Sequence, residues 1–159
     1  MMYPSVRPAV STDYATLVSW IPDARACAQW AGPHLRFPFS PRELSEVIKV
    51  RGAKDFSLVD AEGSLLGFGQ TWPRDDGAVH LGRVIVSPGE RGHALGFVLG
   101  SALVAEAQRD SRTGRVTLRV YRDNPAAISV YAKLGFKTVE AESNAETWAM
   151  ELVGPGGAR

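Results

Sequence analysis

The stretch from residue 78 to residue 109 constrains the fold more than any other part of the chain. Residues 78–86 have the composition of a β-strand, and the Ser-Pro-Gly triplet at 87–89 ends that strand. A long helix is predicted over 94–109, because apolar residues recur there every four positions, at Leu95, Leu99, Leu103 and Ala107. A strand that leads through a glycine-containing turn into an apolar helix requires a sheet on which the helix can pack.

The rest of the chain supplies strands and helices in mixed order. Near the N-terminus we expect a strand over 5–10 and three helices, which begin at Thr12, at Asp23, and at Ser40 or Pro41. The second of these helices should stop at Gly32 and the third at Gly52. Later segments predict strands over 56–60, 65–72, 116–121, 136–140 and 147–152, and a helix that Asn124 caps and Gly135 ends. This order predicts an α/β (α+β) fold, a mixed central sheet flanked by helices.

Composition limits the partners of the chain. Its 159 residues are 45% apolar and 22% charged, with a net charge of +1, so a basic surface for nucleic acid or an anionic membrane is not expected. The length suits one domain over 1–153, followed by a flexible tail at 154–159. The lone Cys27 cannot form an internal disulfide, and no 18 consecutive residues are apolar. We therefore expect a cytoplasmic protein that does not cross a membrane.

The turn that opens the 94–109 helix is a candidate anion site. Backbone N–H groups at a helix start favour phosphate, Arg91 adds a positive charge, and Gly92 and Gly96 let the backbone approach a ligand. The segment is neither a P-loop nor a dinucleotide fingerprint, because its glycines have the wrong spacing for both. A glycine-rich turn without a ligand explains this segment equally well.

A second segment strengthens the interpretation. Residues 124–136 read NPAAISVYAKLGF, which resembles the Asn-x-x-Ala-x-x-x-Tyr-x-x-x-Gly-Phe signature of the GNAT superfamily of acyl-CoA N-acyltransferases. The turn at 91–96 is similar to the Arg/Gln-x-x-Gly-x-Gly/Ala pyrophosphate loop of the same superfamily. Ala94 stands where the first glycine of that loop usually lies. The resemblance spans residues 65–152, including the order of the elements.

The resemblance implies a fold and a cofactor site. Two central parallel strands should part in a V, and the pantetheine arm of acetyl-CoA should lie in the gap. The cofactor-binding residues that the resemblance implies are Val84, Ile85, Val86, Arg91, Gly92, His93, Ala94, Leu95, Gly96, Asn124, Ala127 and Tyr131. The strand residues would pair with the pantetheine amides like an added strand, and the turn would hold the pyrophosphate.

The implied activity is transfer of an acetyl group from acetyl-CoA to a primary amine, by direct attack in a ternary complex. Tyr131 would be the general acid for the departing thiolate, although a packing tyrosine is the alternative. His80 occupies the place where some members carry a basic Glu, and an imidazole with an ordinary pKa suits that role; a plain strand histidine is the alternative. Arg119 occupies the place of a second family variant's Glu and cannot act as a base. A non-catalytic acyl-CoA-binding sensor is the alternative function.

The acceptor side is expected among the aromatic residues of the first half. Trp30, Phe37 and Trp72 are candidates for an acceptor pocket, although packing explains them equally well. Glu140, Glu142 and Glu146 cluster in the last predicted hairpin and Asp75 and Asp76 lie in another turn, where they form either an acidic rim or solvated loops. The three histidines lack metal-ligand spacing, so no metal is expected. The expected partners are acetyl-CoA and a small amine or peptide acceptor, for a monomer or homodimer.

Overall fold

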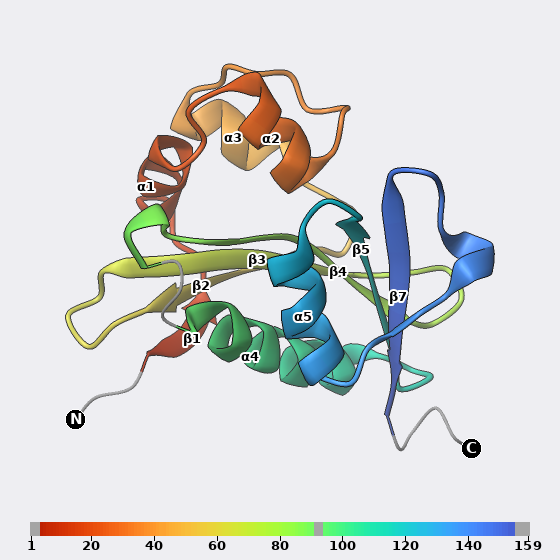
Figure 1. Ribbon diagram of the computed structural model, residues 1–159. Helices are drawn as coiled ribbons and strands as arrows, with labels where there is room; N and C mark the ends of the chain where they lie inside the picture. Colours follow the sequence, from red (N-terminus) through yellow and green to blue (C-terminus); the bar gives the residue numbers. More distant parts are fainter. Residues whose placement is uncertain (1–3, 91–93, 155–159) are drawn as a thin grey trace.

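A computed structural model describes residues 4–90 and 94–154 (Figure 1). Within them, seven strands form one mixed sheet in the order β1-β2-β3-β4-β5-β7-β6. The strands are β1 (Ser5–Pro8), β2 (Lys54–Val59), β3 (Leu65–Pro73), β4 (Val79–Val86), β5 (Arg115–Tyr121), β6 (Lys137–Thr138) and β7 (Thr147–Val153). Only β4 and β5 pair in parallel among these strands. The predicted α/β fold class is therefore confirmed.

Helices cover both faces of the sheet (Figure 1). On one face lie α1 (Asp13–Ser19), α2 (Ala24–Ala31) and α3 (Pro41–Val47), which pack with Phe68 in one apolar cluster. On the other face lie α4 (Leu95–Asp110) and α5 (Pro125–Lys133), which share a second apolar cluster with β2, β4, β5 and β7. Short 3₁₀ turns, η1 (Pro88–Glu90) and η2 (Glu140–Glu142), complete the described chain. None of its helices is long and apolar enough to cross a membrane.

Side-chain caps explain where the helices begin. Asp23 accepts a hydrogen bond from Ala26 N, Asn124 accepts one from Ala127 N, and Ser40 forms a reciprocal capping box with Glu43. These predicted starts are confirmed. Thr12 makes no side-chain cap, because its backbone is helical (φ −70°, ψ −20°) rather than extended as a capping residue's is.

The end of α3 differs from the prediction. The helix stops at Val47, and Gly52 lies in the following turn with a φ of 75°. The Ile48 carbonyl accepts hydrogen bonds from the side chains of Gln70 and Arg83 on the sheet. A helix continued to Gly52 would have used this carbonyl within its own backbone ladder, so a tertiary contact ends α3 early.

The two parallel strands part after three residue pairs. Val79, His80 and Leu81 pair with Val116, Thr117 and Leu118, and both strands then continue without pairing each other. On its other side, β4 shifts register against β3 between Phe68 and Gln70. Two β4 residues, Arg83 and Val84, therefore oppose the single Gly69, which is a β-bulge. Arg83 has a φ of 50°, in the left-handed region, so the bulge bends β4 at the point where the gap opens.

Candidate active site

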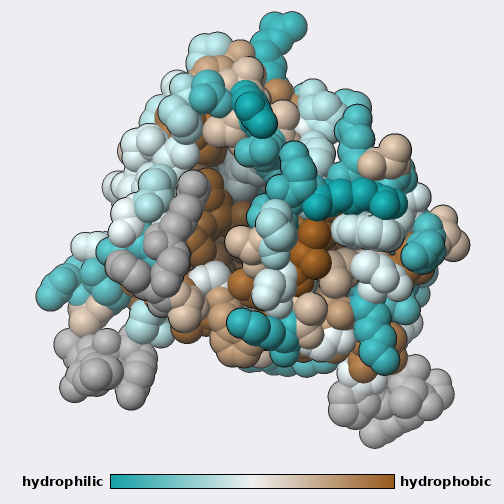
Figure 2. Space-filling view, viewed as in Figure 1, coloured by the Kyte–Doolittle hydropathy of each residue, from teal (hydrophilic) through white to brown (hydrophobic). Residues whose placement is uncertain are grey.

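Two cavities occupy the gap between β4 and β5. Their volumes are about 640 Å³ and 520 Å³. They share the lining residues Gln29, Trp30, Val84, Tyr121 and Asn124, so they form one continuous cleft. Figure 2 shows apolar surface in the hollow between the α1–α3 layer and α5. The cleft has a volume suited to an extended organic molecule.

All three β4 residues that the sequence assigned to the cofactor line the first cavity. Val84, Ile85 and Val86 line it, together with Asn124 at the start of α5. Ser87 N donates to Leu66 O, and Ile85 pairs with Phe68. Because hydrogen-bonded pairs alternate along an antiparallel ladder, the backbone of Val86 turns away from β3 toward the gap. This part of the β4 backbone therefore borders the gap.

The predicted pyrophosphate turn is described only in part. Arg91, Gly92 and His93 lie outside the described residues. Ala94 precedes α4 with a φ of 62°, a left-handed conformation that favours glycine. Leu95 begins α4, and Gly96 follows in its first turn, where an added Cβ would lie 3.7 Å from Val130 on α5. The strained Ala94 thus occupies the position where the motif usually has glycine.

Tyr131 lines the second cavity together with Ala127, one helical turn before it. Its ring is half-buried and meets Phe136 edge to face, with centroids 5.8 Å apart. Burial raises the pKa of the phenol to about 12. No hydrogen bond to the hydroxyl is found within residues 4–90 and 94–154. Tyr131 therefore presents a protonated phenol to the cleft at neutral pH.

His80 lies in the same cavity, on β4. Its Nδ1 is 2.7 Å from Thr117 Oγ1, and its ring lies 5.1 Å from the Trp72 ring. Burial, together with the positive charges of Arg74, Arg119 and Arg83, lowers the pKa of His80 to about 4. The ordinary pKa on which the sequence argument relied does not hold in the folded protein. His80 is instead a neutral imidazole throughout the physiological pH range.

The structure places two of the three aromatic candidates for the acceptor pocket in the cleft and the third outside it. Trp30 and Trp72 line the second cavity. Phe37 packs edge to face on Phe39 within the apolar cluster of α1–α3, and it lines neither cavity. Trp72 covers Gly82, where an added Cβ would lie 2.3 Å from the indole ring. Trp30 donates its indole N–H to Arg83 O at 2.8 Å, which holds α2 on the bulge.

A buried polar chain beneath the cleft was missed by sequence reasoning. Gln70 is fully buried and donates to Ile48 O and to Asp55 Oδ1, both at 2.8 Å. It accepts a hydrogen bond from Arg83 Nη1 at 2.8 Å, and Asp55 accepts one from Tyr14. Both polar residues interrupt strongly apolar strands, Gln70 in β3 and Arg83 in β4. That interruption is the signal that could have identified them.

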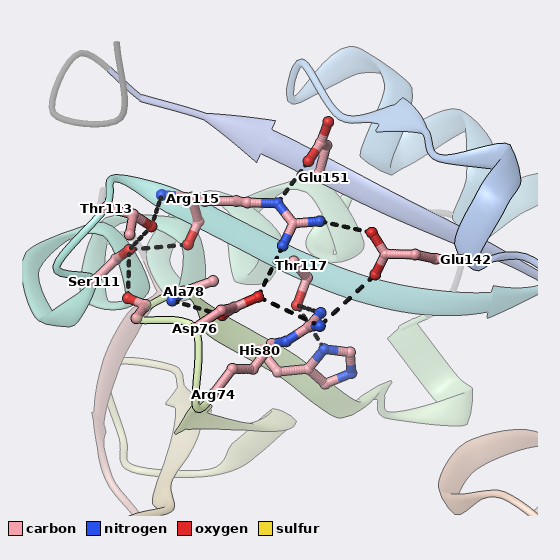
Figure 3. A network of polar contacts seen from close by, with 11 residues as sticks. Arg74, Asp76, Ala78, His80, Ser111, Thr113, Arg115, Thr117, Glu142 and Glu151 are labelled. Atoms are coloured by element: carbon pink, nitrogen blue, oxygen red, sulfur yellow. Dashed lines mark hydrogen bonds and ion pairs between the residues drawn. The ribbon is translucent and has the colours of Figure 1, made fainter. Parts of the chain in front are cut away.

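The acidic turn residues divide into two groups. Asp76 and Glu142 are paired with arginines (Figure 3), whereas Asp75, Glu140 and Glu146 are exposed to solvent. Arg115 forms ion pairs with Glu151 at 2.6 Å, with Glu142 at 3.0 Å and with Asp76 at 3.3 Å. Arg74 adds pairs with Asp76 and Glu142, and its Nη1 donates to Thr117 Oγ1. These arginines therefore neutralise three carboxylates beside the cleft.

No cluster of three potential metal ligands occurs within the part of the chain that the structure describes. The described groups at the cleft include the Tyr131 phenol, the neutral His80 imidazole, the side chains of Arg83 and Arg119, and the parted strands.

Comparison with known proteins identifies a family whose profile matches this chain. The profile of the Acetyltransferase (GNAT) family matches residues 22–136. Spermidine N-acetyltransferase from Vibrio cholerae, solved with CoA and spermine, has 16% identity over 98% of both chains and a TM-score of 0.78. A GNAT superfamily phosphinothricin acetyltransferase from Sinorhizobium meliloti, solved with AcCoA, has 19% identity over 98% of this chain and 91% of that one, with a TM-score of 0.74. A domain from Methanocaldococcus jannaschii has 16% identity over 96% of this chain and 99% of that one, with a TM-score of 0.76.

Proposed function

The chain belongs to the GNAT acetyltransferase family, and on that premise we propose that it transfers an acetyl group from acetyl-CoA to a primary amine by direct attack in a ternary complex. The observation that carries the proposal is the continuous cleft at the parted strands, with Tyr131 and His80 on its second cavity. Two structures of the same fold were solved with CoA or AcCoA, which supports acetyl-CoA as the donor.

The residues present fit the donor. In the proposal, the pantetheine arm lies along Val84, Ile85 and Val86 in the first cavity, and the start of α4 faces the pyrophosphate. The parting of β4 and β5 supports this placement, because the strands already leave space between them for an extended arm. Arg91, Gly92 and His93 complete the proposed pyrophosphate turn, by the resemblance of their motif.

Tyr131 supplies the proton for the leaving group. When the acceptor nitrogen bonds to the acyl carbon, the carbon–sulfur bond breaks and the CoA sulfur takes a proton from the Tyr131 hydroxyl. The raised pKa keeps that proton on the phenol until it is needed. The position of Tyr131 in the second cavity, which shares Asn124 with the first, supports this role.

His80 accepts the proton that the acceptor nitrogen loses. For this role the ring hydrogen must lie on Nδ1 and be donated to Thr117 Oγ1, which leaves the Nε2 lone pair for the amine. The low pKa means that this lone pair is available at any pH well above 4. The low pKa also makes the imidazole a weak base. It can still take a proton from the acceptor nitrogen once that nitrogen has bonded to the acyl carbon, because the nitrogen is then positively charged and strongly acidic.

The test is release of CoA thiol in the presence of a panel of amines, with each product identified by mass. An amine-dependent release that yields the N-acetylated amine is expected. Acetyl-CoA binding measured by calorimetry, without transfer to any amine of the panel, would instead favour the non-catalytic sensor.

A further inference from the structure

The geometry points to an acceptor that carries a carboxylate close to its reactive amine, held in the second cavity by Arg83 and Arg119. This inference rests on the proposed function and adds the substrate class, an amino acid or another small aminocarboxylic acid. Four observations carry it: the environment of each arginine, the pairing of the nearby acids, and the position of His80 between them.

Arg83 brings a cationic side chain to the cavity with no carboxylate in contact. Its Nη1 donates to the neutral oxygens of Gln70 and Ile48, at 2.8 Å and 3.3 Å. Its Nε is buried and has no acceptor among the described residues. The guanidinium lies 5.6 Å from the centre of the Trp72 ring, which also lines the cavity. Since unpaired buried donors are costly, Arg83 is suited to an anionic ligand.

Arg119 lines the same cavity from the other arm of the V. Its neighbours Leu118 and Val120 point into the apolar core, so strand alternation places Arg119 on the opposite face, with Thr117. It donates to Thr147 Oγ1 at 2.9 Å and to Glu142 O at 2.7 Å, which are both neutral acceptors. Its charge therefore also has no carboxylate in direct contact within the described residues.

Most of the acids near these arginines are paired with other arginines or exposed to solvent. Glu142, Asp76 and Glu151 pair with Arg115 or Arg74. Asp55 lies beneath Arg83 with Gln70 between them, and its charge still acts on Arg83 from that side. Glu146 lines the second cavity and Asp123 the first; both are exposed to solvent, as Arg119 is, so water weakens the effect of all three charges. At His80 the positive charges of Arg74, Arg119 and Arg83 dominate.

His80, the proposed proton acceptor, lies between the two positively charged arginines. It pairs with Thr117 one residue before the strands part, so Arg119 and the bulge residue Arg83 follow it on the two arms. A carboxylate held by both arginines would present a neighbouring amine toward His80 and Tyr131, which line the same cavity. A polyamine would instead place its cationic chain against two arginines, which is unfavourable.

The first test compares matched acceptors with the intact protein. Free amino acids are assayed beside their amides, their decarboxylated amines and spermidine, by thiol release and product mass. The expected result is a kcat/KM at least tenfold higher for amino acids than for the matched amides and amines. A preference for spermidine, or equal rates for acids and amides, overturns the inference and leaves the proposed function intact.

The second test removes the charges. Arg119→Gln should raise the KM for the amino acid about tenfold, with little change for the matched amide, and Arg119→Lys should restore part of the loss. Arg83→Gln should act in the same direction, with its fold checked by circular dichroism. Arg109→Gln is the matched control, because it removes the same charge at an exposed position of α4, where Arg109 pairs with Glu106. Equal effects of the Arg119 and Arg109 variants would contradict the assignment.

A binding measurement separates this inference from the proposed function. N-acetylglycine and N-methylacetamide, a product-like acid and its neutral counterpart, are titrated into the ¹⁵N-labelled protein in the presence of CoA, and the arginine Nε–H signals are followed by NMR. The acid should bind at least tenfold more tightly and shift the signals of Arg83 and Arg119. If no amine is acetylated but the acid binds in this way, the proposed function fails and the anionic subsite stands. If the acid binds no better than the amide, the subsite is disproved.

Discussion

His80 Nδ1 lies 2.7 Å from Thr117 Oγ1, and this hydrogen bond joins β4 to β5 one residue pair before the two strands separate. Arg74 Nη1 also donates to Thr117 Oγ1, at 3.2 Å (Figure 3). The hydroxyl therefore links the histidine to the arginine–carboxylate network on the neighbouring turn. This arrangement fixes the orientation of the imidazole and brings positive charge close to it.

The low pKa of His80 predicts a specific pH dependence of stability. Its folded pKa of about 4 lies below the unfolded value near 6.5, so the unfolded chain binds the extra proton first. The stabilisation is complete above pH 6.5 and is lost as the pH falls toward 4. Between pH 7.5 and pH 5, we expect the free energy of unfolding to fall by about 2 kcal/mol through this residue. Urea unfolding at both pH values measures the change.

His80→Gln is the control for this prediction, because glutamine does not titrate. The difference between the two pH values should largely disappear in the variant. Asp13 does not interfere. Despite its burial, hydrogen bonds from Arg7, Val10 and Ser57 keep its pKa below the ordinary value, so Asp13 changes the free energy of unfolding only at a lower pH than the range tested. A variant with the same pH dependence as the wild type would show that His80 titrates normally.

Gln70→Met should destabilise the protein by about 2–4 kcal/mol, because it leaves several buried polar groups without a partner. Methionine matches the length of glutamine but can neither donate to Ile48 O and Asp55 nor accept from Arg83. Denaturant unfolding at neutral pH measures the loss. A loss below about 0.5 kcal/mol would mean that water replaces the amide at no cost.

The sequence was sufficient to predict the parts of the fold that depend on local chemistry. The cap residues Asp23 and Asn124 act on the next turn of the chain, and Gly32 ends α2 with a φ of 85°. The paired motifs at 91–96 and 124–136 identified the family that the profile confirms. These features need no knowledge of distant contacts.

The parts that escaped prediction depend on residues far apart in the sequence. The bulge residue Arg83 is held by contacts with Trp30 of α2, with Ile48 just after α3 and with Gln70 of β3, which lie far from it in the sequence. The depressed pKa of His80 requires the burial and the arginines that only the folded chain assembles. The pairing of Glu142 with Arg115 likewise spans 27 positions. Patterns of local spacing carry no information about such contacts.

Gly82→Ala should disturb the cavity through Trp72. The new methyl group would lie 2.3 Å from the indole ring, so the ring must move away from its place beside His80. We expect a loss of about 1–3 kcal/mol in stability and a change in tryptophan fluorescence. Gly89→Ala is the matched control, because nothing lies within 4 Å of its added Cβ. Identical fluorescence in the Gly82 variant and the wild type would contradict the predicted displacement.

Ala94→Gly should stabilise the protein by about 1 kcal/mol, because Ala94 has a left-handed backbone in which its Cβ is strained. Ala105→Gly, at an exposed position within α4, should have the opposite sign and cost about 1 kcal/mol. Thermal unfolding of the two variants beside the wild type measures both effects. If the methyl group also crowds the proposed pyrophosphate site, calorimetry should show tighter acetyl-CoA binding by the Ala94 variant. A destabilised Ala94 variant would show that the left-handed conformation is not retained in solution.

Tyr131→Phe separates proton donation from packing. The substitution keeps the ring against Phe136 and removes a hydroxyl that has no hydrogen-bond partner within the described residues, so stability should be unchanged or slightly higher. If the phenol protonates the departing sulfur, kcat and kcat/KM should both fall by about 10²–10⁴-fold while acetyl-CoA affinity hardly changes. Steady-state kinetics with the best acceptor of the amine panel, together with calorimetry, give these quantities. A fully active variant of lower thermal stability would make Tyr131 a packing residue, and the thiolate would then leave without assistance.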